Sequence, residues 1–179
     1  MPRKTVFLDR DGVINLAIVR DGKPYPPRSV HELQINPDAY STLPLLKSLG
    51  FLLIVVTNQP DVSRGTQTRE AVEAIHAELQ SKLPLDDFLT CYHDQAELCQ
   101  CRKPLPGLIL EAVARHEVIL GDSFLVGDRW RDIDAGFAAG VQTIWIDYGY
   151  RERAPDHIPS ARVTSLLEAG KWIEEVVNR

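Results

Sequence analysis

The sequence predicts an α/β fold built on a doubly wound parallel sheet. Three observations support this: short, wholly apolar runs recur along the chain, helix-length segments separate them, and several runs end on polar residues. A strand that is buried on both faces of a parallel sheet is apolar throughout. Helices between such strands supply the crossovers that parallel strands need. The length of 179 residues predicts a single domain over residues 1–179.

The first predicted strand, residues 6–8, is followed directly by Asp9 and Asp11. Asp9 lies at the carboxyl end of the strand, which is the edge where open α/β sheets bind ligands. Side-chain alternation puts Asp9 and Asp11 on one side and turns Arg10 away from them, and Gly12 permits a sharp turn. Two adjacent carboxylates favour a bound cation or a shared proton, and oxygen ligands suit Mg²⁺. The alternative is a strand end followed by an ordinary Asp-Gly turn.

The remaining elements follow from periodicity, capping and turn residues. Residues 14–29 contain an Asp-Gly pair and three prolines, which predict a flap or hairpin. Asn36 and Pro37 predict a helix start with Asn36 as the N-cap, and Thr68 is the predicted cap of the next helix. Further predicted strands cover residues 51–56, 88–92, 123–126 and 143–147. Predicted helices cover residues 36–47, 68–83, 106–116 and 128–139, and a small strand and an amphipathic helix lie within 161–179.

Composition limits the classes of function. Hydrophobic residues make up 44% and charged residues 25% of the chain, as in ordinary globular proteins. The net charge of -5 argues against a protein that binds the phosphate backbone of nucleic acids. No apolar run approaches the length that crosses a membrane, and the N-terminal segment has no signal-peptide core. We therefore expect a cytoplasmic, monomeric protein without membrane or nucleic-acid partners.

Polar side chains follow the predicted strands in four places, namely Asp9 with Asp11, Thr57, Lys103, and Asp128 with Asp132. The motifs that hold them, DRDGV, VVTN, RKP and GDRWRD, resemble in order and spacing the four motifs of the haloacid dehalogenase superfamily. The resemblance covers nearly the whole chain and implies a Rossmann-like phosphatase that uses Mg²⁺. A chance arrangement on a structural α/β domain is the competing explanation, and a catalytically silent, zinc-stabilised binding module is a second one.

The resemblance implies the chemistry of a phosphomonoester hydrolase. Asp9 is the expected nucleophile, which forms an aspartyl-phosphate. Asp11 is the expected general acid for the leaving oxygen and then the general base for water. The Asp9 side chain, the Asp11 backbone carbonyl and Asp128 are expected to hold Mg²⁺.

Three further residues receive supporting roles from the same resemblance. Thr57 and Lys103 are expected to bind the transferred phosphoryl group, Lys103 as a compact positive charge. Asp132 is expected to orient either the shell around Mg²⁺ or Lys103. Taken singly, each has an ordinary alternative. Thr57 would be a strand-end cap, Lys103 a solvated charge and Asp132 a carboxylate in the first turn of a helix.

All three cysteines lie within eleven residues, with a histidine among them. An odd number of cysteines in a reducing compartment does not indicate a disulfide framework. Three thiolates and one imidazole form a closed tetrahedral set that is typical of structural Zn²⁺. Small buried cysteines beside a surface histidine are the alternative. The set consists of Cys91, His93, Cys99 and Cys101 and predicts a zinc loop over residues 91–101.

The cysteine cluster joined to the CRKP motif resembles one subgroup, the D-glycero-D-manno-heptose 1,7-bisphosphate 7-phosphatases and their histidinol-phosphatase relatives. The resemblance implies a small phosphorylated sugar as substrate, first of all heptose 1,7-bisphosphate cleaved at its 7-phosphate. Histidinol phosphate or another small phosphomonoester is the alternative. A metal-bound loop would hold Arg102 and Lys103 rigidly at the site, and the planar guanidinium of Arg102 suits a phosphate.

The residues expected to bind substrate are Asn58, Gln59, Arg64 and Arg102. The chain departs from the subgroup pattern after Gln59, where Pro60-Asp61 replaces a small residue and a glycine, whereas Arg64 and the glycine after it are retained. Asp61 adds a negative charge where an anionic substrate should bind, so a monophosphorylated sugar is an alternative substrate. The stretches where a cap domain could be inserted hold a flap, one helix and the zinc loop. We therefore expect a capless, open site.

Overall fold

The computed structural model describes residues 2–179 and contains a six-stranded sheet in which all neighbouring strands are parallel. Its order is β5-β4-β1-β6-β7-β8, so the first strand lies inside the sheet and the chain extends outward from it in both directions. This confirms the predicted doubly wound parallel sheet. The strands are β1 (Thr5–Leu8), β4 (Leu52–Asn58), β5 (Asp87–Cys91), β6 (Phe124–Gly127), β7 (Gln142–Ile146) and β8 (Ala161–Val163).

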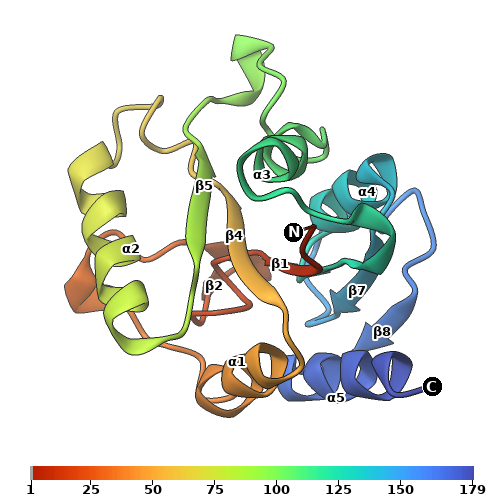
Figure 1. Ribbon diagram of the computed structural model, residues 1–179. Helices are drawn as coiled ribbons and strands as arrows, with labels where there is room; N and C mark the ends of the chain where they lie inside the picture. Colours follow the sequence, from red (N-terminus) through yellow and green to blue (C-terminus); the bar gives the residue numbers. More distant parts are fainter. Residues whose placement is uncertain (1) are drawn as a thin grey trace.

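Helices cover both faces of the sheet (Figure 1). The helices α1, α2 and α5 contribute to the core on one face, and α3 and α4 contribute to the core on the other. The helices α1 and α5 lie side by side below the sheet in the view of Figure 1. The bounds are Ala39–Ser48 for α1, Arg69–Lys82 for α2, Gly107–His116 for α3, Trp130–Ala139 for α4 and Leu166–Val177 for α5.

The strand β4 shows why the predicted strands are apolar throughout. Leu53 and Val55 belong to the core on the α1 and α5 face, whereas Leu52, Ile54 and Val56 belong to the core on the α3 and α4 face. All five side chains are buried. Because each buried aliphatic side chain contributes roughly 1.5–3 kcal/mol, the alternation stabilises both layers at once.

The segment after the first strand forms the predicted hairpin. Strands β2 (Ile18–Arg20) and β3 (Lys23–Tyr25) pair antiparallel. Asp21 and Gly22 connect them with φ angles of 52° and 75°. Two central residues with positive φ are typical of the tight turn that matches the twist of a hairpin. A short 3₁₀ helix, η1 (Val30–Glu32), follows.

The prediction for the start of α1 is wrong by two residues. The helix begins at Ala39, with Asp38 rather than Asn36 at the N-cap. The Asn36 side chain instead donates to the carbonyl of Val13 at 2.8 Å and accepts from the amide of Asp38 at 3.1 Å. The bond from the Asp38 amide is the local turn that asparagine favours. The bond to Val13 anchors this turn to the loop after β1, and short-range sequence rules do not describe that contact.

The strand β4 ends at Asn58, two residues later than predicted. Asn58 lies beside Cys91 in the neighbouring strand β5, and Thr57 lies beside Thr90. The sheet itself therefore holds Thr57, Asn58 and the first cysteine of the predicted zinc loop in fixed register. Two motif regions that are far apart in the sequence become neighbours at one edge of the sheet.

The two stretches where a cap domain could be inserted are short. Between β1 and β4 the chain forms the hairpin, η1 and α1, and between β5 and α3 it forms the predicted zinc loop with a 3₁₀ helix, η2 (Gln95–Glu97). A further 3₁₀ helix, η3 (Leu120–Asp122), precedes β6. Residues 2–179 thus contain no inserted cap domain, as predicted.

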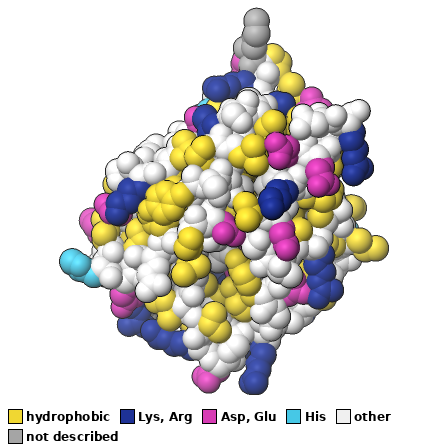
Figure 2. Space-filling model, turned by 90° about the horizontal axis from the view of Figure 1, so that it is seen from below, with side chains coloured by type: hydrophobic (Ala, Val, Ile, Leu, Met, Phe, Trp, Pro, Cys, Tyr) yellow, Lys and Arg dark blue, Asp and Glu magenta, His cyan; other side chains and the backbone are white. Residues whose placement is uncertain are grey.

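The outer surface of α1 and α5 is mixed in character. Figure 2 views the molecule from this side, and basic and acidic side chains are interspersed with hydrophobic ones across it. None of the helices formed by residues 2–179 combines the length and apolar composition that crossing a bilayer requires.

Candidate active site and metal cluster

The carboxyl edge of the sheet brings the predicted catalytic residues together. Asp9 follows β1, Thr57 lies near the end of β4, and Asp128 follows β6. Lys103 reaches the same place from the loop after β5. All four side chains are buried or nearly so. Residues that are distant in the sequence therefore meet where parallel sheets bind ligands.

Lys103 is surrounded by oxygen atoms. Its Nζ lies 2.9 Å from Asp9 Oδ1 and 2.5 Å from Asp132 Oδ1, and it donates to the backbone carbonyl of Val56 at 2.7 Å. Burial alone lowers the pKa of Lys103, but Asp132 and Asp9 raise it above its ordinary value. The ammonium group is therefore held charged. Of the two predicted roles of Asp132, the structure shows the contact with Lys103.

Three buried carboxylates accumulate negative charge beside this lysine. One oxygen from each of Asp9, Asp128 and Asp132 lies within 4.8 Å of the others. Burial and then Asp132 raise the pKa of Asp9 to about 6, although Lys103 opposes the shift. Burial and then Asp9 raise the pKa of Asp128 well above its ordinary value. A bound cation would relieve this repulsion.

Asp128 supplies direct support for a cation at this position. Both of its side-chain oxygens are buried, and neither has a hydrogen-bond partner among residues 2–179. Buried carboxylate oxygens without a donor are costly unless a metal ion binds them. Hard oxygen donors are also the ligands that Mg²⁺ takes. Asp128, together with the neighbouring carboxylate of Asp9, therefore fits Mg²⁺, whereas Asp132 contacts Lys103.

Two glycines make room for these carboxylates. A Cβ atom on Gly12, which has a φ of +85°, would lie 1.9 Å from Asp128 Oδ2. A Cβ atom on Gly127 would lie 2.1 Å from the Cβ of Asp132. Any side chain at either position would push a carboxylate out of place. The glycines in the DRDGV and GDRWRD motifs thus allow the backbone to approach the acidic residues closely.

Asp11 is held by three side chains. Arg10 donates to both Asp11 oxygens at 3.0–3.1 Å, Asn15 donates to Oδ1 at 3.0 Å, and Gln59 donates to Oδ2 at 2.8 Å. The prediction that Arg10 turns away from the two aspartates is wrong. Its side chain is completely buried and folds back onto Asp11, because a buried guanidinium needs a charged partner. Arg10 and Asn15 are thus site residues that the sequence motifs did not indicate.

Asn58 and Gln59 contact other site residues. Asn58 donates to the Lys103 carbonyl at 3.0 Å and accepts from the Lys103 amide at 3.1 Å. Gln59 donates to Thr57 Oγ1 at 2.9 Å as well as to Asp11. The Lys103–Pro104 peptide bond that follows is cis. In the structure, Asn58 thus fixes the backbone of Lys103 and Gln59 links Thr57 with Asp11.

An open pocket lies over these groups and is rich in cations. The hairpin contributes Lys23 and Tyr25 to its wall. The lining also includes five arginines, namely Arg28, Arg64, Arg102, Arg129 and Arg131. Asp9, Asp11 and Lys103 lie in the same pocket. The pocket can therefore receive an anionic molecule beside the buried carboxylates.

The two arginines predicted to bind substrate differ in their partners. Arg64 forms ion pairs with Asp94 at 2.6 Å and with Asp61 at 3.3 Å. Arg102 donates to the backbone carbonyl of His93 at 3.1 Å. Arg64 therefore compensates the negative charge of Asp61, the residue at which the chain departs from its subgroup. It also ties the segment after β4 to the predicted zinc loop.

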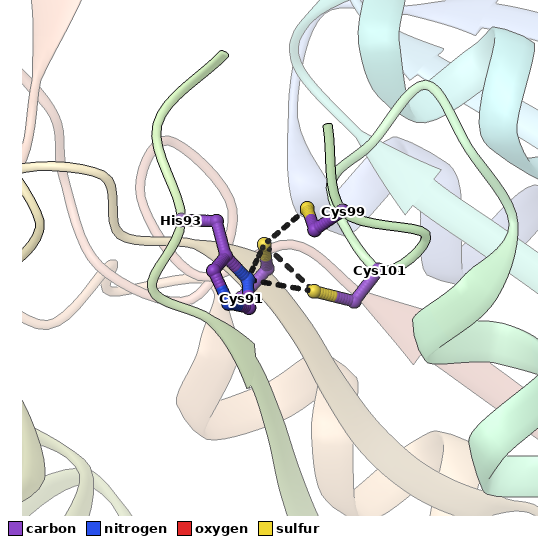
Figure 3. Close-up of side chains that lie close together, drawn as sticks. All are labelled: Cys91, His93, Cys99 and Cys101. Atoms are coloured by element: carbon purple, nitrogen blue, oxygen red, sulfur yellow. Dashed lines mark hydrogen bonds between the residues drawn. The ribbon is translucent and has the colours of Figure 1, made fainter. Parts of the chain in front are cut away.

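The four predicted zinc ligands converge on one point (Figure 3). Cys91 Sγ lies 3.0 Å from Cys101 Sγ and 3.7 Å from Cys99 Sγ. His93 Nδ1 lies 3.6 Å from Cys91 Sγ and 3.3 Å from Cys101 Sγ. The cysteines are not joined by disulfides. The side chains come from the end of β5 and from the loop before α3.

This cluster has the dimensions of a tetrahedral zinc site. With zinc–sulfur bonds of about 2.3 Å, two sulfur ligands of one ion lie about 3.8 Å apart. The separation of 3.7 Å between Cys91 and Cys99 matches that edge length, and the separation of 3.0 Å between Cys91 and Cys101 is shorter. Burial raises the pKa of the Cys91 thiol, so a cation is needed to keep it as a thiolate. The donor set fits Zn²⁺.

Curated proteins with similar sequences share one kind of name. Over 145 residues the chain is 37% identical to the D-glycero-beta-D-manno-heptose-1,7-bisphosphate 7-phosphatase of Helicobacter pylori (strain ATCC 700392 / 26695), a match that covers 78% of this chain and 80% of the relative. Over 153 residues it is also 37% identical to the D-glycero-alpha-D-manno-heptose-1,7-bisphosphate 7-phosphatase of Mycobacterium tuberculosis (strain CDC 1551 / Oshkosh), covering 76% and 77% of the two chains.

Solved structures agree with this similarity. The D,D-heptose 1,7-bisphosphate phosphatase from B. bronchiseptica, complexed with magnesium and phosphate, superposes with a TM-score of 0.78 at 25% identity and covers 97% of this chain and 99% of that one. A HAD-like phosphatase from Mesorhizobium loti gives a TM-score of 0.79 at 28% identity, covering 99% and 88%. The HAD-hydrolase-like family model matches residues 100–169.

Proposed function

This chain belongs to the D-glycero-D-manno-heptose-1,7-bisphosphate 7-phosphatases, a family of haloacid dehalogenase-like hydrolases, and from this we propose that it removes the 7-phosphate of D-glycero-D-manno-heptose 1,7-bisphosphate. The observation that carries the proposal is the buried group of Asp9, Lys103 and Asp132 beside the unpartnered oxygens of Asp128. It combines a nucleophile, a fixed positive charge and a place for a divalent cation. Phosphate esters react slowly without such charge neutralisation.

In the first step Asp9 attacks the phosphorus atom. Asp9 Oδ1 already accepts from the Arg10 amide at 2.8 Å and contacts Lys103 at 2.9 Å, so Oδ2 supplies the attacking electron pair. The bond between phosphorus and the sugar oxygen breaks as Asp11 gives that oxygen a proton. The products are the sugar alcohol and a phosphoryl group bound to Asp9. Lys103 and Thr57 stabilise the charge on the phosphoryl oxygens.

In the second step water releases the phosphate. Asp11, now a carboxylate, takes a proton from a water molecule whose oxygen attacks the phosphorus atom. The bond between phosphorus and Asp9 breaks, which frees inorganic phosphate and restores the Asp9 carboxylate. Asp11 is again protonated and ready for the next substrate. The pocket is open to solvent, so water can enter without movement of a cap domain.

Mg²⁺ and Zn²⁺ have separate places in this proposal. Asp9, Asp128 and the Asp11 backbone carbonyl would hold Mg²⁺, which neutralises the charge of the incoming phosphoryl group when it is bound. Asp132 would lie outside the direct ligands. Zn²⁺ would be a structural ion in the loop over residues 91–101. Its ligands are Cys91, His93, Cys99 and Cys101.

The substrate assignment is tested by phosphate release with Mg²⁺ present. Because relatives named for the alpha and the beta heptose share the same identity with this chain, both anomers of heptose 1,7-bisphosphate are compared. Histidinol phosphate and hexose monophosphates complete the series. We expect the highest kcat/KM for one heptose bisphosphate anomer. A higher kcat/KM for histidinol phosphate would make histidinol phosphate the assigned substrate. If no ester releases phosphate, the phosphatase assignment is wrong.

A further inference from the structure

Arg10 is a charged side chain in the interior of the protein. It is completely buried and is among the largest side chains that have no exposed surface. Its Nε and Nη2 donate to the Asp11 carboxylate, and Nη1 lies 3.1 Å from Nε2 of His76. His76 lies on α2, 66 residues further along the chain. All three ends of the guanidinium are therefore engaged.

The direction of the Arg10–His76 hydrogen bond follows from chemistry. A guanidinium only donates and stays protonated in proteins, so Nη1 is the donor and Nε2 of His76 must accept. Burial and the Arg10 charge lower the pKa of His76 to about 3, which agrees with a neutral ring. The ring also stacks on Phe88 of β5, with centroids 4.5 Å apart and planes 20° apart. His76 is thus fixed in position by packing from one side.

Stability alone is a weak explanation for this arrangement. Removing a guanidinium and a carboxylate from water costs free energy that their attraction only partly repays, and apolar replacements are often equally stable. The arrangement does achieve a defined geometry at Asp11. Arg10 is the side chain that contacts both Asp11 oxygens, whereas Asn15 and Gln59 each contact one. Residues 2–179 hold no cap domain that could align Asp11 by closing.

We propose that His76 is a positioning residue for phosphate ester cleavage: through Arg10 it fixes the Asp11 carboxyl group where it gives a proton to the leaving oxygen. The inference rests on the proposed function, because it requires Asp11 to be the general acid. His76 itself touches neither the substrate nor the reacting atoms. Without an acceptor at Nε2, the Arg10 Nη1 group would be buried with no hydrogen-bond partner. The guanidinium would then rotate toward a different acceptor and no longer hold Asp11 in the same position.

The test compares two variants on two esters. His76→Phe keeps a ring that can stack on Phe88 but removes the acceptor, whereas His76→Gln keeps an acceptor near the position of Nε2. One ester is the sugar phosphate, whose alcohol needs a proton to leave. The other is 4-nitrophenyl phosphate, whose leaving group needs none. The quantity measured is kcat/KM, which reports the steps up to release of the leaving group.

We expect His76→Phe to lower kcat/KM about ten- to a hundredfold on the sugar phosphate and less than about threefold on the aryl ester. His76→Gln should recover most of the lost rate. The control His116→Phe replaces a histidine of α3 that pairs with Asp87 of β5, and it should not change the ratio of the two esters. If His76→Phe does not fold, Arg10→Lys, which keeps the charge but loses the fork, should show the same selective loss.

Two results would overturn the inference. Equal losses on both esters would mean that His76 supports the fold rather than the proton transfer, and wild-type values for His76→Phe on both would mean that it has no role. The proposed function fails in a different way. If the wild-type protein hydrolyses neither ester, or if Asp11→Asn keeps the wild-type rate on the sugar phosphate, the phosphatase mechanism itself is wrong.

Discussion

Asp9 lies between one cation and two further carboxylates. Lys103 Nζ is 2.9 Å from it, and oxygens of Asp128 and Asp132 lie within 4.8 Å. An amide at this position is nearly the same size as the acid but cannot form an acyl-phosphate. We therefore predict that Asp9→Asn folds like the wild type and lowers kcat at least about a thousandfold. Phosphate release and circular dichroism are the measurements.

The control for this variant is Asp122→Asn, which makes the same chemical change at an exposed position of η3. It should behave like the wild type in both measurements. Turnover by Asp9→Asn close to the wild-type value would contradict covalent catalysis by Asp9.

The second prediction at the scale of residues concerns Arg102. This arginine lines the pocket and contacts the His93 carbonyl, whereas Arg64 is already paired with two aspartates. We expect Arg102→Ala to remove a charge-assisted contact with a second phosphate, which lowers kcat/KM for the bisphosphate about ten- to a hundredfold. The loss should be much smaller for a heptose 7-phosphate.

Arg115→Ala is the matched control for Arg102, because Arg115 pairs with Glu111 on the outer side of α3 and does not line the pocket. An equal loss on mono- and bisphosphate would show that Arg102 supports the transferred phosphate or the loop. The specificity role would then be wrong.

Individual side chains differ in how far the sequence predicts their positions. The order of the motifs is enough to predict that Asp9, Thr57, Lys103 and Asp128 share one sheet edge. The same reasoning misses Arg10. Alternation along a strand predicts that the Arg10 side chain points away from Asp11. In the structure the side chain folds back onto Asp11, and His76 on a distant helix completes its hydrogen bonds. Short-range rules cannot describe a side chain whose position depends on a tertiary contact.

Among the elements, the predicted zinc loop is held both by its own cysteine cluster and by the segment after β4. The pair Arg64–Asp94 at 2.6 Å and the hydrogen bond from Ser63 to Glu97 at 2.6 Å fix its middle, while the cysteine cluster joins its ends. We predict that Cys99→Ser loses bound zinc, lowers Tm by roughly 5 °C and speeds amide exchange across residues 92–103. The rate of catalysis should fall indirectly, because the loop leads directly into Lys103.

Metal analysis and hydrogen exchange measure these effects, and chelation provides the comparison. Mild chelation of the wild type should abolish activity until Mg²⁺ is added back, and zinc should remain bound throughout. Carefully purified, fully active protein that contains no zinc would contradict a structural zinc site.

The elements differ in how well the sequence predicts them. The apolar runs identify the strands because burial on both faces leaves no polar position, as β4 shows. Thr68 is correctly predicted as the cap of α2, where its side chain accepts from the Ala71 amide. The predicted start of α1 is wrong because the Asn36 side chain bonds to Val13 in the loop after β1, which is 23 residues away in the sequence.

At the scale of the whole molecule, the fold joins the catalytic edge to the opposite layers of helices. Lys103 reaches the edge from the loop before α3, while Arg10 reaches back to α2 on the other face of the sheet. Changes that unfold α2 should therefore disturb Asp11 as well as the core. The contact between α2 and Arg10 is made by His76, a titratable side chain, so protonation of His76 would break it.

The last prediction concerns acid stability. The pKa of His76 is lowered to about 3 in the folded protein by burial and by Arg10, whereas an unfolded histidine has a pKa of about 6.5. Below pH 6.5 the unfolded chain therefore binds a proton that the folded protein does not. Stability is complete above pH 6.5 and is lost as pH falls toward 3. Between pH 7 and pH 5 this amounts to about 2 kcal/mol.

The difference between the wild type and His76→Phe isolates this contribution from those of the buried carboxylates. Urea unfolding at a series of pH values with Mg²⁺ present measures it. We expect the wild type to lose about 2 kcal/mol of unfolding free energy relative to the variant between pH 7 and pH 5. Parallel stability curves for the two proteins over this range would mean that His76 is protonated as easily in the folded protein as in the unfolded chain. A neutral acceptor for Arg10 would then be excluded at the lower pH values.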